Sequence, residues 1–183
     1  MNNLEKKIQN IVNLYKLKRL SEAETLGKNL IYSYPKVYFL HNLLGLIMYE
    51  QKKFIEAVNF YKSGLKIKPN YAMIYNNLGM LYKDTHNYIE SEKNYKKSIE
   101  IDNSLPEAHN NLGNLYVELN KQEAAIKTYQ NSIQVNPKFY IAHFNLGITY
   151  KSMGNFEKAK EHLLQSIKIF PNFFSAHRAL SQV

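Results

Sequence analysis

Glycine recurs along this chain with a fixed period of 34 residues. The glycines that keep this spacing are Gly45, Gly79, Gly113 and Gly147, and four of the five prolines share a register of the same length. The segments around these glycines are HNLLGLIMY, YNNLGMLY, HNNLGNLY and HFNLGITY. Such a repeat limits a 183-residue chain to a row of small, similar units, because each unit must bury its apolar residues against its neighbours.

Each unit has the sequence pattern of a helical hairpin. Its apolar residues recur every three to four positions, which is the period of an α-helix. Short polar breaks, such as ELNK at 118–121 and SMGN at 152–155, divide the unit into two apolar runs. Small residues recur in the second run at Ala57, Ser91, Ala125 and Ala159. A larger side chain there would hold two crossing helices apart, so each unit is predicted to be a helix, a tight turn and a second helix.

The glycine, small-residue, tyrosine and proline positions together resemble the signature of the tetratricopeptide repeat family. The resemblance implies an all-α fold, a right-handed α-solenoid of stacked helix-turn-helix repeats. With glycine at position 8, the predicted units are a divergent first repeat at 4–37, four repeats at 38–71, 72–105, 106–139 and 140–173, and the first helix of an incomplete sixth repeat at 174–183. The last segment lacks a second helix to cover it. We therefore expect either that the chain continues or that two copies form an end-to-end homodimer.

The sequence contains no arrangement typical of an enzyme. It has no phosphate-binding glycine loop, no nucleophile elbow, no carboxylate pair at a useful spacing and no cysteine. Four histidines share repeat position 4, namely His41, His109, His143 and His177. Successive helices about 8–10 Å apart do not bring such residues around one zinc ion, so we expect them at helix–helix contacts. We predict no catalytic site, no metal site and no cofactor.

The net charge of +9 raises the question of nucleic-acid binding. The predicted first helices hold 6 Lys+Arg against 5 Asp+Glu, whereas the rest of the chain holds 18 against 10. The basic excess therefore lies on the second helices and turns, the predicted convex side, where charges are usually solvated. Nucleic acid is not the expected partner, and weak, salt-sensitive attachment to this side is the alternative.

The start of the chain lacks the apolar core of a signal peptide, and no run approaches the roughly 18 apolar residues of a membrane span. A cytoplasmic location without a membrane span is therefore the expectation.

One side of each first helix is predicted to line a concave groove. Positions 2, 5, 9 and 12 cluster on that side at 100° per residue, opposite the positions that pack inward. The predicted binding residues at these positions are Phe39, Asn42, Met73, Asn76, Met80, Asn110, Asn114, Phe144 and Ile148. Apolar and amide side chains on a concave face suit an extended peptide or a helix of a partner protein. Alternatively, the curvature of the solenoid itself covers some of them.

Position 6 carries asparagine in three successive repeats, at Asn77, Asn111 and Asn145. This resembles the superhelical repeat region of O-linked N-acetylglucosamine transferase, and the resemblance implies an asparagine ladder that holds the backbone of a bound protein. The asparagines alternatively bond to neighbouring repeats and brace the stack. The carboxylate clamp of tetratricopeptide domains that bind heat-shock chaperone C-termini is absent, since position 2 has no lysine and position 6 no arginine.

These observations together predict a scaffold for protein–protein interaction that binds an extended peptide or a helix in its groove. The alternative is the substrate-recruiting arm of a larger enzyme, such as a glycosyltransferase. The full-length reading frame distinguishes these two hypotheses, because only the second requires a catalytic domain. No residue of the repeats distinguishes them.

Overall fold

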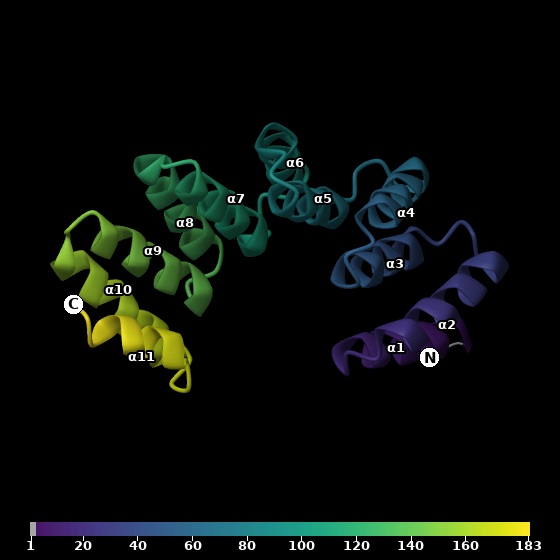
Figure 1. The fold of residues 1–183 in the computed structure, drawn as a ribbon, viewed down its shortest axis with the longest axis horizontal. Helices are drawn as coiled ribbons and strands as arrows, with labels where there is room; N and C mark the ends of the chain where they lie inside the picture. The colour runs from purple at the N-terminus through teal and green to yellow at the C-terminus, as the bar shows by residue number, and fades with distance from the viewer. Residues whose placement is uncertain (1–2) are drawn as a thin grey trace. The chain divides into compact units, whose positions relative to one another are not determined.

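A computed structural model describes residues 3–183 of the chain (Figure 1). This part of the chain forms eleven helices and no strand. The helices are α1 (Asn3–Lys16), α2 (Leu20–Ser33), α3 (Tyr38–Glu50), α4 (Phe54–Ile67), α5 (Ala72–Asp84), α6 (Tyr88–Ile101), α7 (Pro106–Glu118), α8 (Gln122–Val135), α9 (Tyr140–Ser152), α10 (Phe156–Ile169) and α11 (Phe174–Leu180). The predicted all-α fold of helix-turn-helix repeats is confirmed.

The chain divides into two compact units, one ending at Leu81 and the other extending from Tyr82 to Val183, so the boundary falls near the end of α5. In the first unit, α2 packs against both α1 and α3, and α3 packs against α4. In the second unit, α7 contacts α6 and α8, α9 contacts α8 and α10, and α10 contacts α11. First helices of successive repeats also touch, since α1 contacts α3 and α7 contacts α9. Each unit therefore presents neighbouring first helices on a common face.

Gly45, Gly113 and Gly147 lie where the two helices of a hairpin cross. A Cβ atom added to Gly113 would lie 2.5 Å from the Cε1 atom of Tyr129, and one added to Gly45 would lie 2.3 Å from Cε1 of Tyr61. Both tyrosine rings are buried, so they have little room to move away. Close helix crossing thus explains the 34-residue glycine period.

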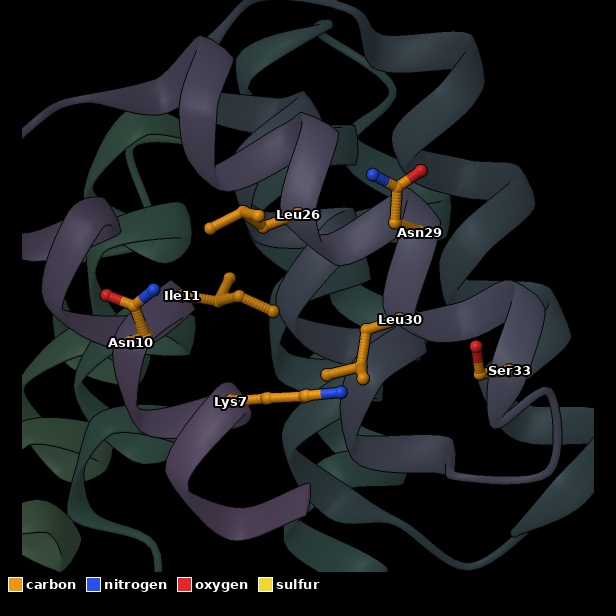
Figure 2. Close-up of a pocket in the computed structure, with 7 residues that line it drawn as sticks. All are labelled: Lys7, Asn10, Ile11, Leu26, Asn29, Leu30 and Ser33. Carbon is orange, nitrogen blue, oxygen red and sulfur yellow. The ribbon is translucent and has the colours of Figure 1, made fainter. Parts of the chain in front are cut away.

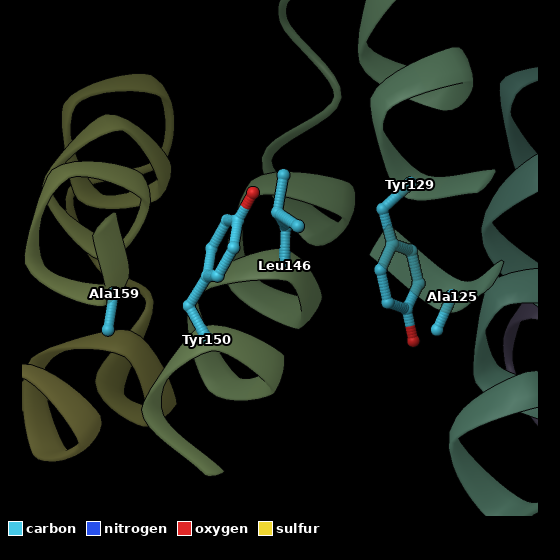
Figure 3. Close-up of a cluster of buried hydrophobic side chains, with 5 residues drawn as sticks. All are labelled: Ala125, Tyr129, Leu146, Tyr150 and Ala159. Carbon is cyan, nitrogen blue, oxygen red and sulfur yellow. The ribbon is translucent and has the colours of Figure 1, made fainter. Parts of the chain in front are cut away.

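Figure 3 shows how the second unit continues this packing from one repeat to the next. Ala125 and Tyr129 of α8, Leu146 and Tyr150 of α9, and Ala159 of α10 form one buried cluster (Figure 3). Ala125 and Ala159 stand at the predicted small position and are fully buried. Small and aromatic residues thus alternate through the core, which allows α8, α9 and α10 to pack closely.

The turn inside each hairpin is a Schellman motif with one residue in the left-handed conformation. After α3, the Lys53 N–H donates to the Met48 carbonyl at 2.9 Å and the Lys52 N–H donates to the Tyr49 carbonyl at 2.9 Å. The left-handed residue is at position 15 in all five repeats, and these residues are Lys18, Lys52, His86, Asn120 and Gly154, with φ of 59°, 62°, 58°, 56° and 76°. Only the fifth repeat has glycine, the residue with no steric penalty there.

We predict that Lys52→Gly stabilises the protein modestly. The left-handed conformation costs an ordinary residue about 1–2 kcal/mol, whereas glycine adds about 0.5–1 kcal/mol of entropic cost. The net gain should be measurable as a rise in the melting temperature, followed by circular dichroism. Asn120→Gly is the matched control and should gain less, because asparagine tolerates this conformation better than lysine. An equal gain at both turns would contradict the explanation.

Candidate partner-binding face

The outward side of the first helices contains the exposed apolar residues of the predicted groove. Met73 on α5 is 44% exposed, Val117 on α7 is 40% exposed and Ile148 on α9 is 36% exposed. Half-buried members of the same set are Phe39, Leu46, Tyr49, Met80 and Phe144. In the second unit, the contact between α7 and α9 brings the outward sides of these two helices onto one surface. The apolar character expected of this face is therefore present within each unit.

In the first unit, two predicted binding asparagines bond to each other. The Asn77 carboxamide donates through Nδ2 to the Asn42 Oδ1 atom at 2.9 Å. Asn77 and Asn42 are only 6% and 2% exposed. This bond joins position 6 of one repeat to position 5 of the repeat before it.

The second unit contains a larger version of the same arrangement. Asn145 Nδ2 donates to Asn110 Oδ1 at 2.9 Å and to Asn114 Oδ1 at 3.0 Å. The Tyr129 hydroxyl donates to the same Asn114 oxygen at 2.7 Å. A single network thus connects α7, α8 and α9. Asn110 is 4% exposed, while Asn114 and Asn145 are half-buried.

These positions correct part of the sequence analysis. We expected position 5 to be open to a partner, but Asn42 and Asn110 are buried beneath the following first helix. The helical wheel of a single helix places position 5 outward, whereas the neighbouring repeat covers it. Asn76, also at position 5, is half-buried, and so is Asn111 at position 6. Phe144 is only partly covered, since its ring packs edge-on against Phe173 with 4.9 Å between the ring centroids and remains half-buried.

The histidines at position 4 have a role that the sequence analysis missed. The Nε2 atom of each lies within hydrogen-bond distance of a backbone carbonyl six residues earlier, in the exit turn of the preceding repeat. The pairs are His41 with Pro35 at 2.8 Å, His109 with Asn103 at 3.2 Å, His143 with Pro137 at 3.2 Å, and His177 with Pro171 at 2.8 Å. Each ring therefore fixes the turn between two repeats by donating to its carbonyl. The sequence signal for this role was the recurrence of histidine six residues after a residue of the exit turn.

The comparisons with known proteins agree with this geometry. A family model described as TPR repeat matches residues 41–85, 87–120 and 113–154. Two further models described as tetratricopeptide repeat match residues 72–101 and 140–173. The chain belongs to the tetratricopeptide repeat family. No curated protein sequence matches it.

Several solved structures share this fold. The chain is similar to TTC0263, a thermophilic TPR protein of Thermus thermophilus, with a TM-score of 0.83, 16% identity, and coverage of 98% of this chain and 97% of that one. It is similar to YrrB, a TPR protein with an unusual peptide-binding site, with a TM-score of 0.67, 18% identity, and coverage of 97% and 91%. For MamA the TM-score is 0.71, with 17% identity and coverage of 92% and 95%. At these identities the likeness shows the fold alone.

Buried hydroxyl groups in two of the tetratricopeptide repeats differ in a way that can be tested. Tyr129 donates to Asn114, whereas the repeat of Tyr61, the equivalent tyrosine, has Leu46 at the position of Asn114. The Tyr61 hydroxyl is buried and has no hydrogen-bond partner among the described residues. A buried polar group without a partner costs free energy that a bonded one does not.

We therefore predict opposite results for the two Tyr→Phe substitutions. Tyr129→Phe should lower the free energy of unfolding by about 1 kcal/mol, the net worth of a typical hydrogen bond. Tyr61→Phe should leave it unchanged or raise it, because it removes an unpaired hydroxyl. Urea unfolding followed by circular dichroism measures both. Equal losses in the two variants would contradict the assignment of these bonds.

A histidine pair in the fifth tetratricopeptide repeat is sensitive to protonation. The Nδ1 atoms of His143 and His162 are 3.3 Å apart, and the His162 ring stacks on Tyr150. Burial lowers the pKa of both histidines, and the charge of His143 lowers the pKa of His162 further. The folded protein therefore favours the neutral rings.

This pair predicts that stability falls with acidification. Because the unfolded chain takes up protons near the ordinary histidine pKa of about 6.5, stability should be level above that pH. Below that pH the stability should fall, and it should level off once the pH is beneath the lowered pKa of the histidines in the folded state. His162→Gln should flatten the slope of melting temperature against pH. His86→Asn, which changes an exposed turn histidine, should not. Identical slopes for the two variants would rule out the pair as the cause.

Two further features are absent from residues 3–183. None of the helices there is both long enough and apolar enough to cross a membrane. No three or more histidine, aspartate or glutamate side chains in that range come together as metal ligands would.

Proposed function

We propose that this tetratricopeptide repeat protein is a scaffold that binds a segment of a partner protein across the outward side of its first helices. The observation that carries the proposal is the pair of exposed apolar residues Val117 and Ile148, which lie on that side of the contacting helices α7 and α9 in the second unit. Large apolar side chains this exposed favour a binding surface when they share a face. The family membership and the peptide-binding site named for YrrB support the same class of function.

The asparagine network gives this face a polar component. Asn145 uses its Nδ2 group to hold Asn110 and Asn114, so its carbonyl oxygen is the atom suited to accept from a peptide N–H. Asn114 accepts two bonds at Oδ1, so its amide group is the donor suited to a peptide carbonyl. We propose that these two groups engage the backbone of a bound segment, while Val117 and Ile148 contact its apolar side chains.

The other predicted binding residues, taken together with Ile148, are proposed in two roles. Those with accessible surface contact the partner directly, and they are Phe39, Met73, Asn76, Met80, Asn111, Phe144 and Ile148. Of those that are buried, Asn110 orients the accessible Asn145 through its bond, whereas Asn42 and Asn77 bond to each other and hold α3 against α5. Selectivity would arise mainly from the apolar residues, since backbone bonds accept many sequences.

The test is selection of binders from a displayed library of random peptides. Peptides of roughly a dozen residues suit it, because helices about 8–10 Å apart match about three residues of extended chain at about 3.3 Å each. Binding of the selected peptides to the wild-type protein is then compared with binding to Ile148→Asp and Val117→Asp variants. We expect each change to weaken binding at least about tenfold, as for residues that dominate an interface.

The matched control is Ile89→Asp on α6, since Ile89 is 82% exposed and lies on a second helix. It should bind the selected peptides like the wild-type protein. Circular dichroism confirms that each variant is folded before binding is measured. Equal binding by the Ile148→Asp and Ile89→Asp proteins would place the site elsewhere and overturn the proposal.

A further inference from the structure

A pocket of about 280 Å³ lies between α1 and α2 in the first repeat. Figure 2 shows Ile11, Leu26 and Leu30 directed toward a common space, with Lys7 extending toward it from α1. Asn10, Asn29 and Ser33 complete the lining. The floor is therefore apolar and the rim polar, and Lys7 is the one charged residue of the lining.

The same repeat positions receive a helix elsewhere in the chain. Lys7, Asn10, Leu26 and Asn29 stand at repeat positions 4, 7, 23 and 26. The corresponding residues of the fourth repeat, His109, Leu112, Thr128 and Asn131, line a crevice between α7 and α8. There the facing wall comes from α6, through Lys96 and Ile99. The first-repeat pocket is therefore lined by the same repeat positions that, in the fourth repeat, contact the second helix of the preceding repeat.

In the first repeat, α1 and α2 supply the whole lining, and no other described residue provides the facing wall. Leu26 is 39% exposed there. The lining residues of α2 extend from Leu26 to Ser33, about 10 Å along the helix axis. That length matches two turns of a packed helix rather than a single small molecule.

Charge complementarity indicates what such a helix carries. Lys7 forms no ion pair among the described residues, whereas Lys96, on the helix that packs against α7, is paired with Glu92 at 2.7 Å. An acidic residue beside the inserted apolar side chain would neutralise Lys7 at the rim. Terminal helix α11 of a second copy is a poor occupant, because its last turn carries His177 and Arg178. The end-to-end homodimer predicted from the sequence is a separate hypothesis.

We propose that the pocket between α1 and α2 binds an amphipathic helix of a partner protein. The helix inserts an aliphatic side chain between Ile11, Leu26 and Leu30 and presents a carboxylate to Lys7. This surface is distinct from the outward side of the first helices, because it uses positions 4 and 7 instead of positions 2, 9 and 12. Loss of one binding activity therefore leaves the other intact.

The test uses synthetic peptides with the sequence of α6, residues 88–101, held helical by a lactam bridge on the solvent side. One peptide keeps Lys96 and the other carries Lys96→Glu. Methyl NMR spectra of the full chain should show shifts at Ile11, Leu26 and Leu30 on adding the Lys96→Glu peptide. It should bind about tenfold more tightly than the Lys96 peptide at low salt, as expected for a change from like to opposite charges. A third peptide with Ile99→Asp should not bind.

Two protein variants test the role of Lys7. Lys7→Glu should reverse the preference, so that the Lys96 peptide becomes the tighter ligand. Lys6→Glu, a change of the same charge at an exposed neighbour outside the lining, should keep the original preference. Absence of binding by every helical peptide, or a preference that Lys7→Glu does not change, would overturn the proposal. So would self-association of the wild-type chain in sedimentation experiments that Lys7→Glu abolishes, because the occupant would then be a second copy.

Discussion

Replacing Gly113 by valine is expected to lower the free energy of unfolding by about 3 kcal/mol, at the upper end of the range for overpacking a core. An added Cβ would lie 2.5 Å from the Tyr129 ring, which is 2% exposed and held by its bond to Asn114. The two helices would have to separate, and valine adds two methyl groups that increase the overlap. Urea unfolding monitored by circular dichroism measures the loss.

A double-mutant cycle identifies the ring as the cause. Tyr129→Ala is destabilising by itself because it leaves a cavity, but it also creates room for the valine. The two changes together should therefore cost less than the sum of their separate costs. Gly154→Ala is the contrasting variant, since an added Cβ at Gly154 meets nothing within 4 Å and only its φ of 76° disfavours alanine. Strictly additive costs for Gly113 and Tyr129 would refute the packing explanation.

Simultaneous replacement of Asn77, Asn111 and Asn145 by alanine is expected to destabilise the protein by about 2–6 kcal/mol. That estimate counts about 1–3 kcal/mol for each buried acceptor left without its donor. Asn77 serves buried Asn42, and Asn145 serves buried Asn110. This result would support the bracing role that the sequence analysis held as an alternative to a peptide-binding ladder. Thermal and urea unfolding provide the measurement.

Asn59→Ala on α4 is the control, because Asn59 is exposed and alanine has the higher helix propensity. It should leave stability unchanged or slightly increased. Peptide binding by the folded fraction of the triple variant must be measured separately. Unchanged stability together with lost binding would favour the ladder, whereas lost stability with retained binding would assign the asparagines to the structure alone.

The sequence predicted the repeat architecture because its determinants are local. The helical period and the glycine at each helix crossing, such as Gly113 beneath Tyr129, depend on contacts within one hairpin. The burial of Asn42 and Asn110 could not be read from a single helical wheel, because the next repeat supplies the cover. One signal was available in retrospect, since Asn42 and Asn77 are 35 residues apart, as are Asn110 and Asn145.

Other features depend on backbone acceptor atoms that the residue types do not reveal, although the recurring histidine marked the donor. The carbonyls that the position-4 histidines meet belong to Pro35, Asn103, Pro137 and Pro171, and nothing in those residue types indicates an acceptor for an imidazole. The finer resemblance to the O-linked N-acetylglucosamine transferase repeats also stays a prediction, because the matched family models describe the repeat in general.

The position-4 histidine contacts affect where the boundaries of expressed fragments of this chain should be placed. His177 on α11 holds the Pro171 carbonyl in the turn that follows α10, and His41 on α3 does the same for Pro35 after α2. The first helix of one repeat therefore supplies the histidine that holds the exit turn of the repeat before it. A fragment that stops after a second helix loses this contact, whereas one that retains the next first helix keeps it. Expression boundaries placed in the left-handed turn at position 15 should accordingly give more stable fragments than boundaries placed at the aligned ends of the repeats.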